Sequence, residues 1–207
     1  MNIKSDPGHY LTIDAIYGPA EIKEKGSRFI GYLYPVSTLE AVETILHQCR
    51  KKYYDATHVC FAFRLGRGKE EYFRYSDDGE PGGTAGLPIF NEIKGRDYFN
   101  VLAVVIRYYG GTKLGTGGLA RAYAAAVRLV IDTAKTVTVT ITKEVSLNFP
   151  FEKTGEIMNI IRLFSLDIVS QEYSGEGVAM KLAVPVTRLE EVTHTLTQTS
   201  KGQLTFE

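Results

Sequence analysis

The passage from Val101 to Tyr123 constrains this chain more than any other, because it joins a buried strand to a glycine-rich loop and a helix. Residues 101–106 form a continuous apolar run, which is typical of a strand buried on both faces. The glycines among residues 110–118 leave most backbone N–H groups open to a ligand. Apolar residues then recur at helical spacing from Leu119. We therefore expect a loop that ends at a helix N-terminus, where N–H groups and the helix dipole favour an anion.

Positive charge accompanies this loop, although the whole chain is neutral. The sequence has 24 Lys and Arg residues and 24 Asp and Glu residues, so no global basic field favours nucleic acid. No acidic residue lies between Asp97 and Asp132. The basic residues in that interval are Arg107, Lys113, Arg121 and Arg128. This local excess predicts a site for an anion or a phosphate backbone. The alternative is that the glycines only allow a tight strand-to-helix turn and close packing.

Two standard nucleotide motifs do not fit the loop. Residues 115–120 satisfy the GxGxxA pattern after a strand, but no acidic residue follows on a second strand at the distance expected for ribose binding. A P-loop requires GK[ST] at the end of the loop, whereas Lys113 precedes Gly115. The sequence therefore disfavours both a dinucleotide site and nucleotide hydrolysis by a P-loop.

A second loop combines carboxylates with glycines. Its candidate residues are Asp77, Asp78, Gly79, Glu80, Pro81, Gly82, Thr84 and Gly86. The carboxylates can supply oxygen ligands to Mg²⁺, or they can cap backbone N–H groups and pair with basic side chains. The basic candidates for such pairs are Arg28, Arg107 and Arg121. We favour the structural pairs and predict no metal, and no His or Cys spacing in the chain suits zinc.

His58 and Cys60 share one face of a predicted strand at residues 57–65, because side chains alternate along a strand. Residues at i and i+2 lie roughly 6–7 Å apart, too far for the hydrogen bond that activates a thiolate. We therefore expect Cys60 in the core. The His58 ring can reach either loop, so it is a candidate site residue, and a structural histidine with satisfied hydrogen bonds is the alternative.

The order of predicted elements indicates an α+β protein with two domains. The first domain is predicted over residues 1–134. Its strands are expected at residues 10–16, 22–36, 57–65, 71–75 and 101–106, with breaks at Gly18-Pro19 and Gly26. Its helices are expected at residues 37–53, 87–93 and 119–134, and the first begins with a capping box at residues 37–40.

The sequence changes character after this domain. Residues 135–143 alternate Thr and Val and are predicted to be a linker or an edge strand. The second domain is predicted over residues 144–207, with the order βαββαβ of the ferredoxin-like fold. Its elements are expected at 144–149, 152–164, 167–173, 177–184, 189–197 and 203–206. It carries no dense polar or glycine cluster, so we expect a packing or docking module.

The cysteines and the apolar runs indicate the cellular compartment of the protein. Cys49 and Cys60 form neither a CxxC motif nor a disulfide framework, and the chain shows no signal peptide. No apolar run approaches the roughly 18 residues of a membrane span. We therefore expect a cytoplasmic protein that does not enter a membrane.

Four segments together resemble the Impact/YigZ family. They are KGSRF at 25–29, ATH at 56–58, DDGEPGGTAG at 77–86 and VIRYYGGTKLGTGGLARAY at 105–123. The resemblance implies an N-terminal Impact domain with a ribosomal-protein-S5-domain-2-like fold and a C-terminal ferredoxin-like domain similar to the last domain of elongation factor G. The chain resembles the bacterial form, which lacks the extra N-terminal domain of eukaryotic members. Those eukaryotic relatives regulate translation, so the resemblance implies association with RNA or the ribosome.

We therefore predict a translation-regulating protein that binds phosphate groups of RNA or the ribosome. The predicted contacts are Lys25, Ser27, Arg28, His58, Arg107, Tyr108, Tyr109, Gly110, Gly111, Thr112, Lys113, Gly115, Gly117, Gly118, Arg121 and Tyr123. The two tyrosines are candidates for stacking on bases if they face outward. No catalytic residue and no cofactor is predicted, and the sequence leaves the oligomeric state open.

Two alternatives remain open from the sequence. In the first, the chain is an enzyme or sensor that binds a small phosphorylated metabolite between the two loops. Asp77, Asp78 or Glu80 would then hold Mg²⁺, and His58 would act as acid or base. In the second, the chain is an adaptor for a protein partner of the translation machinery, and the glycine motif only shapes the fold.

Overall fold

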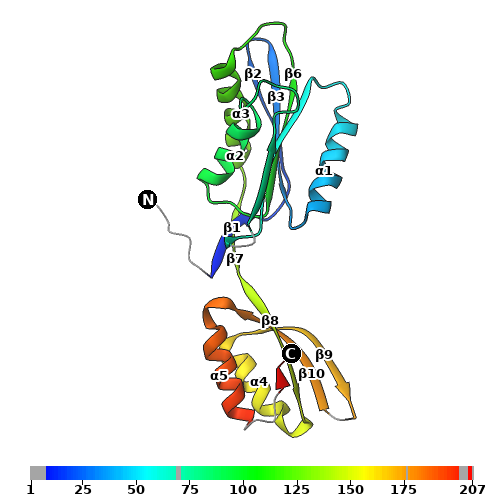
Figure 1. The fold of residues 1–207 in the computed structure, drawn as a ribbon, viewed down its shortest axis with the longest axis vertical. Helices are drawn as coiled ribbons and strands as arrows, with labels where there is room; N and C mark the ends of the chain where they lie inside the picture. Colours follow the sequence, from blue (N-terminus) through cyan, green and yellow to red (C-terminus); the bar gives the residue numbers. More distant parts are fainter. Residues whose placement is uncertain (1–7, 69–70, 176, 201–204, 207) are drawn as a thin grey trace. The chain divides into compact units, whose positions relative to one another are not determined.

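The computed structural model describes residues 8–68, 71–175, 177–200 and 205–206. The chain divides into two compact units, which Figure 1 shows in sequence colours. One unit is Tyr10–Val139, and the other contains the described residues from Thr140 onward together with Gly8 and His9. Both units combine helices with antiparallel strands, so the α+β fold class is confirmed.

A five-stranded antiparallel sheet forms the centre of the first unit. Its spatial order is β2 (Tyr17–Glu24), β3 (Ser27–Pro35), β6 (Val101–Tyr108), β4 (His58–Leu65) and β5 (Tyr72–Ser76). The apolar run at residues 101–106 is the middle strand, and all six residues are 0% exposed. The prediction of a strand buried on both faces is therefore confirmed.

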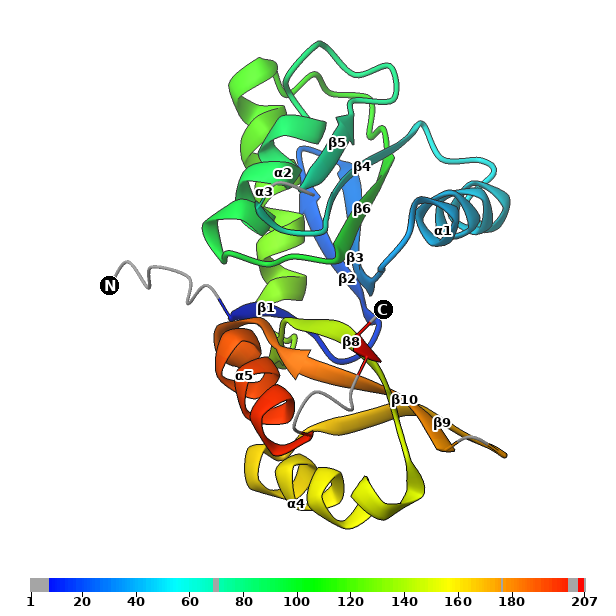
Figure 2. The same cartoon turned by 60° about the horizontal axis from the view of Figure 1, so that its bottom comes forward.

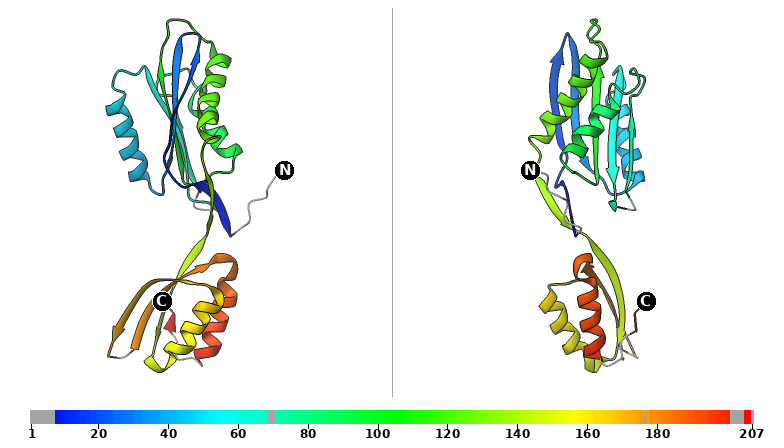
Figure 3. Two further views of the ribbon diagram at one scale, coloured as in Figure 1. Left: turned by 180° about the vertical axis from the view of Figure 1, so that it is seen from behind. Right: turned by 60° about the vertical axis from the view of Figure 1, so that its left-hand side comes forward.

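Three helices cover the two faces of this sheet. They are α1 (Leu39–Lys52), α2 (Gly86–Gly95) and α3 (Thr116–Ile131). Figure 1 and Figure 3 show α1 on one face and α2 with α3 on the other. The alternation of β6 explains both layers: Val101, Ala103 and Val105 join the cluster under α2 and α3, while the even-numbered residues between them join the cluster under α1.

Local signals set the first helix as expected. The Thr38 hydroxyl accepts a hydrogen bond from Ala41 N at 3.2 Å, which is the N-cap that the capping box predicts. The acidic Glu40 lies in the first turn and basic residues lie in the last, as the helix dipole favours.

Two predicted boundaries are wrong in an instructive way. Gly18 and Pro19 lie inside β2 rather than between strands, with a register shift between Tyr17 and Ala20. Because β2 is an edge strand, it tolerates a proline that donates no ladder hydrogen bond. Helix α3 begins at Thr116 rather than Leu119, so the last glycines of the predicted loop form its first turn.

A small second sheet lies outside the main one. It pairs β1 (His9–Ile13) with β7 (Thr136–Thr140). Residues 135–143, predicted as a linker or an edge strand, contain β7 and the first residues of the next strand. The Tyr98 hydroxyl and the Thr136 hydroxyl hydrogen-bond at 2.5 Å, which ties β7 to the segment before β6.

The second unit has the ferredoxin-like order that the sequence predicts. Its elements are β8 (Thr142–Phe149), α4 (Thr154–Phe164), β9 (Asp167–Ser174), β10 (Gly177–Pro185), α5 (Leu189–Ser200) and β11 (Thr205–Phe206), with single turns η2 (Phe151–Lys153) and η3 (Val186–Arg188). The strands lie in the order β11-β8-β10-β9, and Figure 2 shows α4 and α5 on one face. Residues 203 and 204 of the predicted last strand lie outside the described residues. The two-domain fold class implied by the resemblance is thereby confirmed.

Among the described residues, no helix is long and apolar enough to cross a bilayer.

Candidate functional site

Both glycine-containing loops of the first unit line one cavity of about 490 Å³. We call residues 77–85, between β5 and α2, the carboxylate loop, and residues 109–115, between β6 and α3, the glycine loop. The lining residues are Glu80, Pro81, Arg107, Tyr109, Lys113, Leu114, Gly115, Thr116 and Leu119. Both loops therefore contribute residues to the same cavity.

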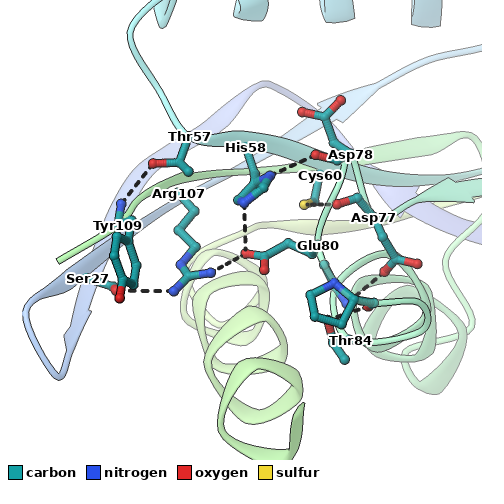
Figure 4. Close-up of polar contacts among 12 residues, drawn as sticks. Ser27, Thr57, His58, Cys60, Asp77, Asp78, Glu80, Thr84, Arg107 and Tyr109 are labelled. Atoms are coloured by element: carbon teal, nitrogen blue, oxygen red, sulfur yellow. Dashed lines mark hydrogen bonds and ion pairs between the residues drawn. The ribbon is translucent and has the colours of Figure 1, made fainter. Parts of the chain in front are cut away.

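A buried ion pair lies at one side of this cavity, as Figure 4 shows. Arg107 at the end of β6 donates through Nη1 to Glu80 Oε1, and the two side chains are 6% and 2% exposed. The Tyr123 hydroxyl donates to the same oxygen at 2.7 Å, and Ser27 Oγ lies 3.4 Å from Arg107 Nη2. Arg107 Nε is buried without an acceptor among the described residues. The pair is therefore well held but leaves one donor unsatisfied.

His58 connects the sheet to the carboxylate loop. Its Nδ1 lies 2.8 Å from the carbonyl oxygen of Asp78, and its Nε2 lies 3.8 Å from Glu80 Oε1. Because a carbonyl only accepts, Nδ1 must carry the proton of this hydrogen bond. The prediction that the His58 ring reaches one of the loops is confirmed.

Cys60 and Tyr123 are core residues beneath the cavity. Cys60 is 0% exposed, and its Sγ lies 3.1 Å from Asp77 O and 3.3 Å from the Tyr123 hydroxyl. Burial, together with the nearby carboxylates, raises the pKa of the Cys60 thiol to about 12, so the thiol stays protonated at neutral pH. Burial likewise raises the pKa of Tyr123. Cys60 is therefore structural, as expected, and Tyr123, predicted as a ligand contact, instead positions Glu80.

Asp77 and Asp78 accept backbone hydrogen bonds that stabilise the carboxylate loop. Asp77 accepts three backbone hydrogen bonds, from Gly83, Ala85 and Gly86 at 2.8 to 2.9 Å. Burial alone would raise the pKa of Asp77, but these three donors lower it below its ordinary value. Asp78 accepts from Val59 N at 2.7 Å. The capping role that we favoured for these carboxylates is confirmed.

The carboxylate loop pairs with one predicted arginine and with one that was not predicted. Of the three arginines proposed as partners, Arg107 pairs with the carboxylate loop, whereas Arg28 pairs with Glu21 at 2.8 Å. Arg50, 3.3 Å from Asp78, was not predicted. Among the described residues, no group of three or more His, Cys, Asp or Glu side chains is arranged to hold a metal ion.

The glycine loop contains one glycine that packing requires. A Cβ on Gly110 would overlap the carbonyl carbon of Gly26, and Gly110 N donates to Ser27 Oγ at 3.1 Å. In contrast, Gly111 and Gly115 have positive φ values of 85° and 73°, and no atom lies within 4 Å of their Cβ positions. The first glycine is therefore structural, and the others shape an open backbone.

The start of α3 presents free backbone donors to this region. Gly115 is the N-cap and provides no side-chain cap, and the first helical bond runs from Leu119 N to Gly115 O. The N–H groups of residues 116–118 therefore have no acceptor within the part of the chain that the structure describes. Lys113 is exposed beside them and has no side-chain partner there. Exposed donors at a helix N-terminus beside a cationic side chain are the features that proteins use to bind anions.

Comparisons with known proteins place the chain in a family. Residues 25–131 match the family model described as the Impact N-terminal domain. The chain belongs to the Impact family. It is 33% identical over 181 residues to IMPACT family member YigZ of Escherichia coli (strain K12), covering 87% of this chain and 88% of that protein. It is 30% identical over 194 residues to an IMPACT family member of Haemophilus influenzae, covering 93% of each.

A solved structure agrees with this assignment. The crystal structure of a hypothetical protein superposes with a TM-score of 0.71 at 31% identity, covering 96% of both chains. The resemblance noted in the sequence is therefore confirmed, and the similarity to the solved structure covers residues of both units.

Several predicted contacts of the Impact domain lie outside the cavity lining. Lys25 lies in the turn between β2 and β3, and Arg28 pairs with Glu21 while lying over the Tyr108 ring at 5.4 Å. Ser27 is 0% exposed and supports Arg107 rather than contacting solvent. The other predicted residues outside the lining are His58, Tyr108, Gly110, Gly111, Thr112, Gly117, Gly118, Arg121 and Tyr123. The predicted set thus separates into lining residues and residues that support or flank them.

Sequence reasoning also missed part of the lining. Leu114, Thr116 and Leu119 line the cavity although they carry no obvious binding chemistry. Their positions next to Lys113 and Gly115, and on the first turn of the helix, were the available signals. An apolar wall beside a cationic rim is typical of small-ligand sites.

Proposed function

We propose that this Impact-family protein binds RNA or the ribosome through a phosphate group held in the cavity, and that it acts in translation. The observation that carries the proposal is the convergence of the uncapped α3 N-terminus and Lys113 on one cavity. The family resemblance, through eukaryotic relatives that regulate translation, supports the biological setting.

The charges of the interval between Asp97 and Asp132 support phosphate at this place. Arg107 is neutralised by Glu80, and Arg128 pairs with Glu92 at 2.6 Å. Lys113 and Arg121 are the two remaining basic side chains of that interval, and both are exposed without a partner among the described residues. Uncompensated positive charge therefore lies on the loop and on the first turns of α3, where backbone N–H groups also point.

The direct test is co-sedimentation with ribosomes and titration with labelled single-stranded RNA over a range of salt concentrations. We expect binding to weaken with salt, and Lys113→Ala to reduce the magnitude of the logarithmic salt slope by about one. Arg121→Ala is expected to act in the same direction. Lys94→Ala is the matched control, because Lys94 is an exposed lysine in the last turn of α2 and does not line the cavity.

The outcome of this titration is decisive for the proposal. Weaker binding and a smaller salt slope in Lys113→Ala, with normal binding in Lys94→Ala, support it. Binding that is absent, independent of salt, or equally weakened by both substitutions would overturn it.

A second candidate function is recognition of a small phosphorylated metabolite, and the shape of the site favours it. The cavity of about 490 Å³ lies within the range of roughly 300–1,000 Å³ that small-molecule sites occupy. A thermal-shift screen of phosphorylated metabolites, with and without Mg²⁺, tests this function. Stabilisation by one compound in the wild type but not in Lys113→Ala, without any ribosome or RNA binding, would favour this candidate over the first.

A further inference from the structure

We propose that the cavity accommodates a whole nucleotide, with its phosphate at the α3 N-terminus and its base on the ring of Tyr109. This inference rests on the proposed function, because it takes the phosphate position from there and adds the chemistry of the rest of the ligand. A nucleotide within RNA and a free nucleoside phosphate share this chemistry, and the experiment below distinguishes them.

Two independent observations indicate that a ligand occupies this cavity, and the first of them defines its phosphate end. The N–H groups of residues 116–118 have no acceptor among the described residues, and Lys113 lines the cavity next to them. Arg107, only 5% exposed, also lines the cavity, and its buried Nε–H lacks an acceptor in the described part of the chain. A buried donor without an acceptor is rare in folded proteins and marks a group that a ligand can satisfy.

The base end is defined by Tyr109. Its side chain is part of the cavity lining, and the residue is 47% exposed. Arg107 Cζ lies 5.5 Å from the ring centroid, and Tyr109 N donates to Thr57 Oγ1 at 3.0 Å, so both the ring and its backbone are positioned. A positioned aromatic ring with exposed surface is a stacking platform for any base.

Three of the other lining residues are apolar. Pro81, Leu114 and Leu119 provide apolar wall around the same space. A phosphate needs no such wall, whereas a base buries apolar surface against it. The lining therefore suits a ligand that has both a charged end and a planar end.

The position of Glu80 decides which end of the nucleotide lies on which side of the cavity. Its carboxylate lines the cavity, so a phosphate placed against it would meet like charge. Arg107 neutralises Glu80 but leaves no net positive charge at that side of the cavity. The charged end of the ligand therefore belongs at Lys113 and α3, and the uncharged base belongs over Tyr109 near the ion pair.

The experiment measures displacement of labelled single-stranded RNA from the full chain by adenosine 5′-monophosphate, ribose 5-phosphate and inorganic phosphate. Calorimetry of each competitor alone shows whether a free nucleoside phosphate binds. We expect adenosine 5′-monophosphate to compete about tenfold better than ribose 5-phosphate, because stacking is lost without a base. Tyr109→Ala should abolish this difference and Tyr109→Phe should keep it. Tyr54→Ala is the control, since Tyr54 is 86% exposed and lies outside the lining.

The outcomes separate this inference from the proposed function. If RNA binds in a Lys113-dependent manner but the nucleotide and ribose 5-phosphate compete equally, the nucleotide inference is overturned and the proposed function stands. If the nucleotide binds in a Tyr109-dependent manner but RNA does not, the inference stands for a free nucleoside phosphate and the RNA function fails. Absence of binding by every probe overturns both.

Discussion

The carboxylate loop and the glycine loop look alike in the sequence, since both combine several glycines with charged residues, but they differ in how their polar groups are satisfied. In the carboxylate loop, Asp77, Asp78 and Glu80 each bond to protein groups. In the glycine loop, Lys113 and the N–H groups at the start of α3 find no partner among the described residues. Polar groups that are satisfied internally stabilise the fold, whereas unsatisfied groups at a cavity are available to a ligand.

This difference predicts which substitutions affect stability and which affect binding. The carboxylate loop should respond to mutation with loss of folding free energy. The glycine loop should respond with loss of binding, apart from Gly110, which packs against the turn between β2 and β3. The predictions below test this division.

The largest expected effect is that of Glu80→Gln. Glutamine keeps an acceptor for Tyr123 but leaves Arg107 buried without a counter-charge, which costs about 3–5 kcal/mol in comparable buried pairs. Denaturant unfolding measures the loss. The control is Glu92→Gln, because its partner Arg128 is exposed and such pairs contribute less than about 1 kcal/mol. Equal losses in the two variants would show that the buried pair has no special role.

Gly110→Ala should have the next largest effect. Its new Cβ would overlap the backbone of Gly26, so the two turns must separate, at a cost of about 1–3 kcal/mol or more. Gly117→Ala is the matched control, since its Cβ would meet only the end of the Arg121 side chain at 3.4 Å. Alanine in that helical turn is expected to be neutral or stabilising by up to about 1 kcal/mol. A Gly110→Ala protein as stable as Gly117→Ala would contradict the close approach.

Asp77→Ala should destabilise the protein by about 1–2 kcal/mol, because it removes the acceptor for three N–H groups at the start of α2. Thr38→Ala, which removes one such bond at α1, is the comparison and should cost less. Hydrogen exchange should show faster opening of the first turn of α2 in Asp77→Ala only. Unchanged exchange there would indicate that the cap is not needed.

Asp77 also predicts a pH dependence. Because its folded pKa lies below its ordinary value of 3.8, its stabilisation is present above that value and is lost as pH falls through the folded pKa. The free energy of unfolding should therefore fall more steeply in the wild type than in Asp77→Asn as the pH drops through 3.8 toward the folded pKa. Parallel pH profiles in the two proteins would contradict this assignment.

The smallest expected effect on stability is that of Lys113→Ala. Since Lys113 is exposed and has no partner within the described residues, unfolding free energy should change by no more than about 0.5 kcal/mol. The same variant should bind RNA more weakly, with a smaller salt slope. A larger loss of stability would mean that Lys113 stabilises the glycine loop through contacts within the protein. The proposed difference between the two loops would then be wrong.

Local pattern was enough to predict most of the fold. The six apolar residues at 101–106 can only be hidden between two layers, and the βαββαβ order of the second unit leads directly to its observed sheet. The errors arose where tertiary position overrides local preference. Pro19 is accommodated because β2 lies at a sheet edge, which no local pattern near Pro19 could show.

The sequence predicted the lining of the candidate site only in part. It identified Lys113, Gly115 and the helix N-terminus, because their chemistry depends on neighbouring residues and backbone geometry. It assigned Arg107, Ser27 and Tyr123 to ligand contact, whereas the structure shows that they form or support the buried pair with Glu80. Their roles depend on residues distant in the chain, so spacing alone could not separate support from contact.

By itself, the sequence determined the strand, the glycine loop and the helix of residues 101–123, together with the local excess of positive charge around them. Only the tertiary structure decided which of those charges remains free. Glu80 and Arg107 lie 27 residues apart and Ser27 and Arg107 lie 80 residues apart, so their contacts exist only once the sheet has formed. Folding buries Arg107 against its partner Glu80 and leaves Lys113 exposed at the cavity. A charge can be buried at acceptable cost only when it is paired, whereas an unpaired charge is stable in contact with water.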